Sequence, residues 1–495
     1  MSQDHSRPNI LLILTDQHRY DTLGCYGAEI CQTPHLDGLA ARGVRFDRAY
    51  TATVPCSPSR AALFTGVYPH KNHVRVNNQE VNPHIPNLAT ELSAAGYNLG
   101  YAGKWHVDEP KVATDHGFEG KDFPGYGYPI YKGMLEGFRF GPPRDSEGAT
   151  AHYETYLKSH DLPLPKILDA HYGDNPGKQG QEMYALHSGG IESSFEAMVA
   201  EDTIDLLRSM QQRRQESGEP FFIWANFWGP HTPCLIPDPY YSMYDPASIP
   251  VEPSFEETWA RKPFVQQLVE RYWGLSNGGW LRWREIVARY WGYVTMIDDL
   301  IGMILAELEA LGCADTTLVV FSTDHGDNMG AHRLIEKGPF TYEQCYRLPM
   351  IVADPGCVAP GSVCEEFVYL QDLYPTFLEL AGRPSPTEPD TLSILDQIQG
   401  KGGSTGRESV YAQFFAQLFH YEQRMIRTRT HKFVYNHSDI GELYDLVNDP
   451  WEMHNLFGLP ELKELQDDLM QALREHMVRL GDPALRDFDA VRHVY

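Results

Sequence analysis

Apolar residues along the chain form four short, nearly continuous runs, and each run stops at a polar residue. The runs are rich in β-branched and aromatic side chains, which is typical of strands buried on both faces of a mainly parallel sheet. They cover residues 9–16, 97–104, 221–227 and 317–324. Between 286 and 308, apolar residues recur three or four positions apart, which predicts a helix. Alternating strands and helices predict an α/β fold, with a large mainly parallel sheet sandwiched by helices.

Polar side chains with metal-binding or proton-carrying groups lie at the ends of these predicted strands. In open α/β sheets the carboxyl ends of parallel strands meet at one edge, and functional residues gather beyond that edge. We therefore expect the side chains to form one site. They are Asp16, Gln17, Lys104, His106, His231, Asp324 and His325.

The strand and helix pattern also predicts how the chain divides into domains. Residues 1–400 form the predicted catalytic domain, with insertions near 107–190 and 232–285 that are rich in Pro, Gly, Tyr and Trp. Long irregular insertions commonly serve as lids or binding loops, although surface decoration or an oligomer contact is the alternative. A Gly-rich stretch at 400–406 predicts a flexible connection. Short apolar runs and one helical pattern in 401–495 predict a smaller C-terminal α+β domain.

Composition excludes several classes of function. The chain has 495 residues, of which 42% are apolar, so it can bury a large core. Its 41 Lys and Arg against 67 Asp and Glu give a net charge of −26, which disfavours nucleic acid and anionic membranes as partners. No apolar run reaches the roughly 18 residues that a membrane helix needs.

The first residues and the cysteines predict the cellular compartment. Residues 1–8 are polar and lack the apolar segment of a secretion signal, so we expect a cytoplasmic protein, while a trimmed leader would leave the same pattern. The eight cysteines include no CxxC pair, which suits reduced thiols better than a disulfide framework.

The segment around Cys56 predicts a nucleophile at the start of a helix. Ser57 or Cys56 caps the expected helix, Pro58 suits its first turn, and Gly66 ends it. Free N–H groups at a helix N-terminus favour an anion, and Arg60, one turn along, can bind two anion oxygens. From these residues alone, Cys56 is a thiolate nucleophile, a buried structural cysteine or a modified residue.

Motifs spread over nearly the whole chain resemble those of the sulfatase family. In that family the cysteine of the Cys56-Ser57-Pro58-Ser59-Arg60 signature is oxidised to formylglycine, an aldehyde whose hydrate attacks the substrate. The resemblance implies an alkaline phosphatase-like fold and a formylglycine-generating enzyme as maturation partner. Further matches are Pro8-Asn9-Ile10-Leu11-Leu12-Ile13 with Asp16, Thr33-Pro34-His35-Leu36-Asp37, Gly103-Lys104-Trp105-His106, Gly229-Pro230-His231, Asp324-His325-Gly326-Asp327 and Leu443-Tyr444-Asp445-Leu446.

The predicted metal ligands are two carboxylates, an amide and an imidazole, joined by residue 56. Carboxylate and amide oxygens suit a hard divalent ion, and an imidazole leaves manganese open. The resemblance implies calcium most often, with manganese or magnesium as alternatives. Many sulfatases have a second Asp at the position of Gln17. A site with a glutamine there resembles that of phosphonate monoester hydrolases. The set is Asp16, Gln17, Cys56, Asp324 and His325. We expect Asp327 and Asn328 to support ligands, and Asp298-Asp299 to lie on a solvated helix face.

The resemblance assigns catalytic roles to Cys56, Arg60, Lys104, His106, His231 and Lys337. Taken singly, each Lys or His would ordinarily be a surface lysine or a hydrogen-bonded histidine, and whether Asn78 lines the pocket stays open. Together these residues supply the positive charge and the proton carriers that sulfuryl transfer requires.

We therefore predict hydrolysis of an aryl or carbohydrate sulfate ester, with a small-molecule or saccharide substrate. Lys104 followed by His106 matches sulfatases better than phosphonate hydrolases, which is the main reason for choosing sulfate. The alternatives are a phosphonate monoester or phosphate diester hydrolase with the same site, and a catalytically silent binding protein. The sequence leaves homo-oligomer formation open.

Overall fold

The computed structural model describes residues 7–123, 147–172, 182–275, 278–385 and 391–493. At its centre lies an eight-stranded sheet in the order β13-β2-β12-β10-β1-β8-β4-β5. Strands β10, β1, β8, β4 and β5 run parallel to one another, and β12 pairs antiparallel with β10 and β2. The strands are β1 (Asn9–Asp16), β2 (Val44–Phe46), β4 (Asn98–Lys104), β5 (Glu119–Phe123), β8 (Phe221–Pro230), β10 (Thr317–Thr323), β12 (Ile351–Ala353) and β13 (Ser362–Cys364).

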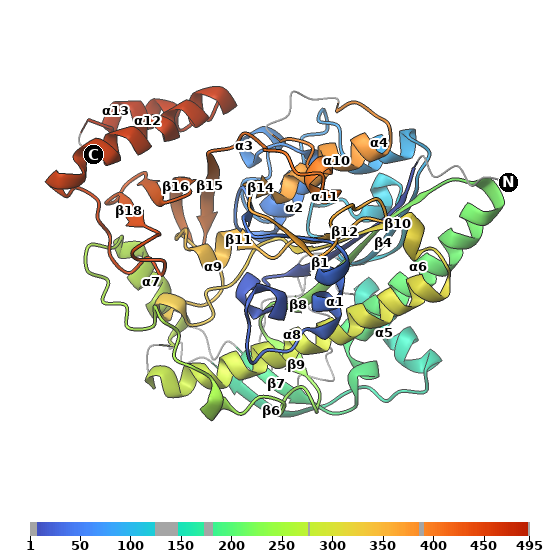
Figure 1. Ribbon diagram of the computed structural model, residues 1–495. Helices are drawn as coiled ribbons and strands as arrows, with labels where there is room; N and C mark the ends of the chain where they lie inside the picture. The colour runs from blue at the N-terminus through green and yellow to red at the C-terminus, as the bar shows by residue number, and fades with distance from the viewer. Residues whose placement is uncertain (1–6, 124–146, 173–181, 276–277, 386–390, 494–495) are drawn as a thin grey trace.

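Helices cover both faces of this sheet (Figure 1). Successive side chains of a strand point to opposite faces, so β1 contributes residues to two separate hydrophobic cores. Leu11 and Ile13 pack with α1, α6 and α8, whereas Ile10 and Leu12 pack with α2, α4 and α10. The helices are α1 (Pro34–Arg42), α2 (Cys56–Thr65), α4 (Leu88–Ala94), α6 (Phe195–Ser217), α8 (Gly279–Ala310) and α10 (Leu373–Leu380). The predicted helix-covered, mainly parallel sheet is confirmed.

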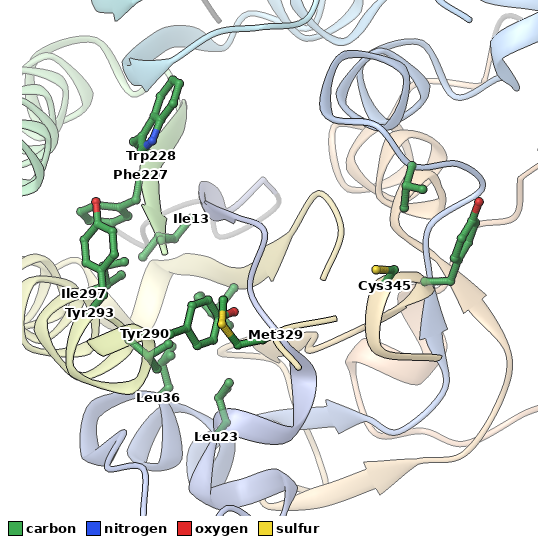
Figure 2. Packing of buried hydrophobic residues seen from close by; sticks show 14 of the residues in the cluster. Ile13, Leu23, Leu36, Phe227, Trp228, Tyr290, Tyr293, Ile297, Met329 and Cys345 are labelled. Atoms are coloured by element: carbon green, nitrogen blue, oxygen red, sulfur yellow. The ribbon is translucent and has the colours of Figure 1, made fainter. Parts of the chain in front are cut away.

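The long helix α8 carries much of the core on its side of the sheet. Its residues Tyr290, Tyr293 and Ile297 are fully buried, and Figure 2 shows them close to β8 and to the loop bearing Met329. The expectation of a solvated Asp298 on this helix is wrong. Asp298 is fully buried, because its carboxylate accepts the backbone N–H groups that begin α1.

The two predicted insertions contain regular structure in their described parts. The first supplies the edge strand β5, helix α5 (Glu147–Ser159) and strands β6 (Ile167–Tyr172) and β7 (Glu182–His187), while 124–146 and 173–181 lie outside the described residues. The second supplies β9 (Cys234–Ile236), which pairs with β7, and helix α7 (Phe264–Trp273). Two-residue strands β3, β11 and β14 form a further small sheet at Ala49–Tyr50, Arg347–Leu348 and Val368–Tyr369.

The C-terminal region forms an antiparallel four-stranded sheet, as predicted, with two helices where the sequence pattern predicted one. Its hydrophobic core is continuous with the α6 and α8 side of the large sheet. Buried charges also connect the two parts, since Lys432 Nζ lies 2.9 Å from Glu343 and 2.7 Å from Glu452. The elements are β15 (Ser409–Gln417), β16 (Phe419–Thr428), β17 (His431–Asn436), β18 (Glu442–Asp445), α12 (Lys463–Leu480) and α13 (Leu485–Val491). Among the described residues, no helix is both long and apolar enough to cross a membrane.

Candidate active site

Cys56 is the first residue of α2 and is almost fully buried. Pro55, not Cys56 or Ser57, occupies the capping position, so the predicted cap is wrong by one residue. Because proline has no side-chain acceptor, the cap comes from outside the helix: Asn77 Oδ1 accepts the Ser57 N–H at 3.1 Å. Gly66 ends the helix with φ +73°, as predicted. The Cys56 side chain thereby stands at an anion-friendly helix start.

Three candidate ligands, Asp16, Asp324 and His325, surround the Cys56 sulfur. Asp16 and Asp324 lie at the ends of neighbouring parallel strands, where Thr15 pairs with Thr323. Cys56 Sγ lies 3.7 Å from Asp16 Oδ1 and 3.1 Å from His325 Nε2. One ligand atom from each of Asp16, Cys56, Asp324 and His325 lies within 4.8 Å of the others, and all four residues are buried. This adjacency follows from the strand pairing that the apolar pattern predicted.

The second oxygen of each carboxylate is held by a cation. Arg60 donates through Nε to Asp324 Oδ2 at 2.8 Å and through a terminal nitrogen to Asp16 Oδ2 at 3.1 Å. Lys104 Nζ lies 2.5 Å from Asp16 Oδ2. We expected Arg60 to bind two oxygens of an anion at the helix start, whereas the structure places its guanidinium on these two carboxylates. Although burial opposes ionisation, Lys104, His231 and Arg60 hold the pKa of Asp16 well below its ordinary value.

The donor set fits a divalent cation. Oδ1 of each carboxylate faces His325 Nε2, at 3.9 Å for Asp16 and 3.8 Å for Asp324, while both Oδ2 atoms are engaged elsewhere. Burial lowers the pKa of His325, but the negative charge of Asp324 and Cys56 outweighs it and raises the pKa to about 9. The negative charge that favours a proton on His325 would also favour a bound metal cation.

Gln17 lies beside this cluster with its amide turned toward Lys337 and Asp327. Its Oε1 accepts from Lys337 Nζ at 2.6 Å, and its Nε2 donates to Asp327 Oδ2 at 2.6 Å. Asp327 also accepts the backbone N–H groups of Met329 and Glu336, so it orients Gln17 and the loop carrying Lys337. This agrees with the supporting role expected for Asp327, and Gln17 as a metal ligand stays a prediction.

Lys337 and His231 form a proton-carrying pair. His231 Nδ1 lies 2.5 Å from the backbone oxygen of Thr232, and its Nε2 lies 2.9 Å from Lys337 Nζ. A carbonyl oxygen can only accept, so Nδ1 carries the hydrogen and Nε2 accepts from the lysine. Burial and the nearby Lys337 ammonium hold the pKa of His231 well below its ordinary value, which keeps the imidazole neutral.

His106 and Asn78 form a second polar pair. His106 Nε2 lies 3.1 Å from Asn78 Oδ1. Burial, together with Lys104 and Arg60, holds the pKa of His106 well below its ordinary value. Gln17, Asn78 and His106 all have positive φ, at 64°, 66° and 44°. Non-glycine residues in this region cost about 1–3 kcal/mol each and cluster at functional sites, which supports the assignment of all three to the site.

The structure adds residues to the site that the sequence did not single out. Trp228 places its ring 4.1 Å from Lys104 Nζ, and Asn226 Oδ1 accepts from Arg60 at 2.8 Å. Glu196 accepts the backbone N–H groups of Trp228 and Gly229. Trp228 directly precedes the Gly229-Pro230-His231 motif, which was the available signal. Nothing in the local sequence distinguishes Glu196 from an ordinary acidic residue in the first turn of a helix.

Comparisons with known proteins agree with this geometry. The profile of the sulfatase family matches residues 8–383, and that of the N-sulphoglucosamine sulphohydrolase C-terminal region matches 330–479. The chain is 32% identical to an arylsulfatase of Clostridium perfringens, over 94% of each sequence. It is 27% identical to an N-acetylglucosamine-6-O-sulfatase of Bacteroides thetaiotaomicron, over 97% of this chain and 88% of that protein. The phosphonate monoester hydrolase of Agrobacterium radiobacter superposes with a TM-score of 0.78 at 24% identity, over 96% of each chain.

Proposed function

Because the chain belongs to the sulfatase family, we propose that it hydrolyses sulfate esters with formylglycine at position 56 and one divalent metal ion. The observation that carries this proposal is the position of Cys56. Its sulfur lies at a helix N-terminus, against the ligand cluster of Asp16, Asp324 and His325. Lysines and histidines able to neutralise a sulfuryl group and to move protons surround the same point.

Residue 56 and the metal would supply the nucleophile. Hydrated formylglycine offers two hydroxyls, one that attacks sulfur and one that loses its proton when sulfate leaves. A divalent cation held by Asp16, Asp324 and His325 would lower the pKa of a hydroxyl bound to it. Arg60 keeps both carboxylates ionised and aimed through its bonds to their Oδ2 atoms. Gln17 is a further candidate ligand.

The remaining side chains handle charge and protons. Lys104 and Lys337 stabilise negative charge on the sulfuryl oxygens as the ester bond breaks. Lys337 is the donor toward His231 Nε2, so this pair delivers the proton that the leaving alcohol oxygen needs. The neutral imidazole of His106 takes the proton from the second hydroxyl, which releases sulfate and restores the aldehyde.

A saccharide or small aryl sulfate is the substrate class that we propose. Curated relatives of this chain include an arylsulfatase and an N-acetylglucosamine-6-O-sulfatase. Calcium is the proposed ion because oxygen donors prevail, and the single imidazole leaves manganese and magnesium as alternatives. Conversion of Cys56 would require a formylglycine-generating enzyme.

Phosphonate monoester hydrolysis is the second candidate, and one observation favours it. Gln17 provides a neutral side chain where many sulfatases have an acid, which lowers the negative charge of the site by one. Lys104 followed two residues later by His106, on the other hand, matches the sulfatase pattern better than the phosphonate hydrolase one. Sulfate is therefore the first choice.

A rate panel with enzyme of known modification state tests the proposal. The mass of the peptide containing residue 56 reports modification, because formylglycine formation exchanges sulfur for oxygen and removes two hydrogens. Initial rates on 4-nitrophenyl sulfate, a phenylphosphonate monoester and a phosphate diester then decide the class. We expect the sulfate to be turned over fastest. Faster turnover of the phosphonate would favour the second candidate.

The Cys56→Ser variant tests the nucleophile itself. A serine alkoxide can attack sulfur, but it has no second hydroxyl whose deprotonation expels sulfate. We expect this variant to stop after one turnover or to be inactive. Full multiple turnover by Cys56→Ser would contradict the formylglycine mechanism.

A further inference from the structure

We propose that Glu196 and Tyr293 act as positioning residues, forming a clamp that fixes residues 228–231 and thereby places Trp228 and His231 in the active site. This inference deepens the proposed function, since it assigns residues that support the same chemistry. Both act through the backbone at the end of β8.

The clamp consists of three hydrogen bonds to one buried carboxylate. Glu196 Oε1 accepts from the Gly229 N–H at 2.9 Å and from the Tyr293 hydroxyl at 2.6 Å. Glu196 Oε2 accepts from the Trp228 N–H at 3.3 Å. Glu196 is completely buried, although it lies in the first turn of α6, where acidic residues usually face solvent and favour the helix dipole. Its side chain is directed at β8 instead.

Close packing gives the segment little room to move. A side-chain carbon at Gly229 would overlap the ring of Tyr293 and the end of Ile297, so a residue without a Cβ is needed there. Figure 2 shows Tyr293 and Ile297 of α8 beside Phe227 and Trp228 of β8. Three elements, α6, α8 and β8, therefore determine where the backbone of residues 228–231 lies.

The clamped segment delivers two side chains to the reaction. The centre of the Trp228 ring lies 4.1 Å from the Lys104 ammonium. The same ammonium forms an ion pair with Asp16. A cation over an indole face is attracted by the ring and is more confined than a solvated one. His231, at the far end of the segment, receives the hydrogen bond of Lys337. A shift of the segment would displace both cationic contacts together.

The charge of the clamp matches its three donors. Burial raises the pKa of Glu196 to about 7, while the hydrogen bonds of Tyr293, Gly229 and Trp228 and the charge of Lys104 favour ionisation. The titratable groups facing the carboxyl are thus the Tyr293 hydroxyl on α8 and the Lys104 ammonium on β4. Three donors suit the ionised carboxylate, whereas the protonated acid loses an acceptor and loosens the segment. Activity should accordingly rise as the pH rises through the pKa of Glu196.

Two variants test the clamp while preserving its shape. Glu196→Gln keeps the volume but sets an amide N–H against a backbone donor. We expect kcat on the preferred ester to fall by roughly 10- to 100-fold, because small misplacements of catalytic groups cost that much. In a plot of kcat against pH, the rise in activity near pH 7 (the acidic limb) should disappear in this variant. Tyr293→Phe removes one donor to the carboxylate, so the same limb should move to higher pH by about 1 unit.

Matched controls separate the clamp from general damage. Glu201→Gln lies on the same helix with a half-exposed side chain, and Tyr156→Phe removes a hydroxyl bonded to the Glu192 carbonyl. Both controls should retain the wild-type kcat and pH profile. If Glu196→Gln and Tyr293→Phe also keep the wild-type kcat and an unmoved limb, the proposal is overturned.

Crystal structures of wild type and Glu196→Gln, grown under the same conditions, provide a readout that does not depend on the substrate. The proposal expects residues 228–231 and the Trp228 ring to move relative to Lys104, and an unchanged segment would refute it. A wild-type enzyme that hydrolyses no sulfate or phosphonate ester would contradict the proposed function alone, since the structural comparison still decides the clamp.

Discussion

Replacing Arg60 by methionine (Arg60→Met) removes the cation that two buried carboxylates share. Arg60, Asp16 and Asp324 are all fully buried, so water cannot take the place of the guanidinium. Lys104 stays beside Asp16 at 2.5 Å. Asp324 has no second Lys or Arg partner among the described residues. The substitution therefore leaves its negative charge buried in the low-dielectric interior without a neighbouring Lys or Arg.

The expected loss of stability is large. Removing one partner of a buried ion pair costs about 3–5 kcal/mol. The Arg60 bond to Asn226 Oδ1 at 2.8 Å is lost as well, which adds about 1 kcal/mol. Domains unfold with only about 5–15 kcal/mol in total, so a loss of this size would be plain in any unfolding curve.

The loss should depend on pH in a defined direction. Burial raises the pKa of Asp16, but Lys104, His231 and Arg60 outweigh it and hold that pKa well below the ordinary value of 3.8, so removing Arg60 lets it rise. A carboxylate with a lowered pKa stabilises the fold fully above its unfolded-state pKa, and this contribution is lost as the pH falls through the folded-state value. The deficit of the variant should therefore be constant near neutral pH and shrink below about pH 4, by up to about 1.4 kcal/mol per pH unit. Urea unfolding at about pH 7, 5 and 3.5, with EDTA present so that no cation replaces the guanidinium, measures this change.

A surface arginine provides the control. Arg474 forms a bidentate pair with Asp489 at 2.7 and 2.8 Å, but both side chains are about one-third exposed. Arg474→Met should shift the urea midpoint little at any pH, because solvent screens such a pair. Equal shifts for Arg60→Met and Arg474→Met, or a loss at Arg60 that does not change with pH, would refute the reasoning.

Three further outcomes are expected. His106→Ala should lower kcat by about 10²- to 10⁴-fold as a proton acceptor is lost; initial rates measure this, and an unchanged kcat would argue against its role. Chelation should lower both rate and melting temperature, and adding back Ca²⁺, Mn²⁺ or Mg²⁺ should restore about 2.7 kcal/mol at 100 times the Kd; a melting temperature insensitive to chelator would speak against the metal site. Asp298→Ala should cost about 1–2 kcal/mol through the lost cap of α1. Burial raises the pKa of Asp298 from 3.8 to about 7, so its contribution is greatest at low pH and fades as the pH approaches 7; a deficit in denaturation midpoint that grows with pH would contradict this.

Local sequence predicted the elements that build the site. The strand pattern at 9–16 coincides with β1, and the pattern at 317–324 overshoots β10 by one residue. The helix expected over 286–308 lies within α8 at Gly279–Ala310. These predictions succeeded because burial on both faces of a strand, or on one face of a helix, leaves a periodic record in side-chain polarity. The motif at Cys56 likewise marked a helix start.

Contacts between elements far apart in the chain leave no periodic pattern in the local sequence, so they could not be predicted in this way. The burial of Asp298 depends on where α1 docks against α8, and polarity alone suggested the opposite. Arg60 turned toward Asp16 and Asp324 because two carboxylates converge there once β1 and β10 pair. Glu196 became part of the site because α6 packs across the end of β8. The sequence by itself determined which candidate residues lie at which strand ends, whereas the tertiary structure decided which charges meet, because that depends on packing between segments far apart in the chain.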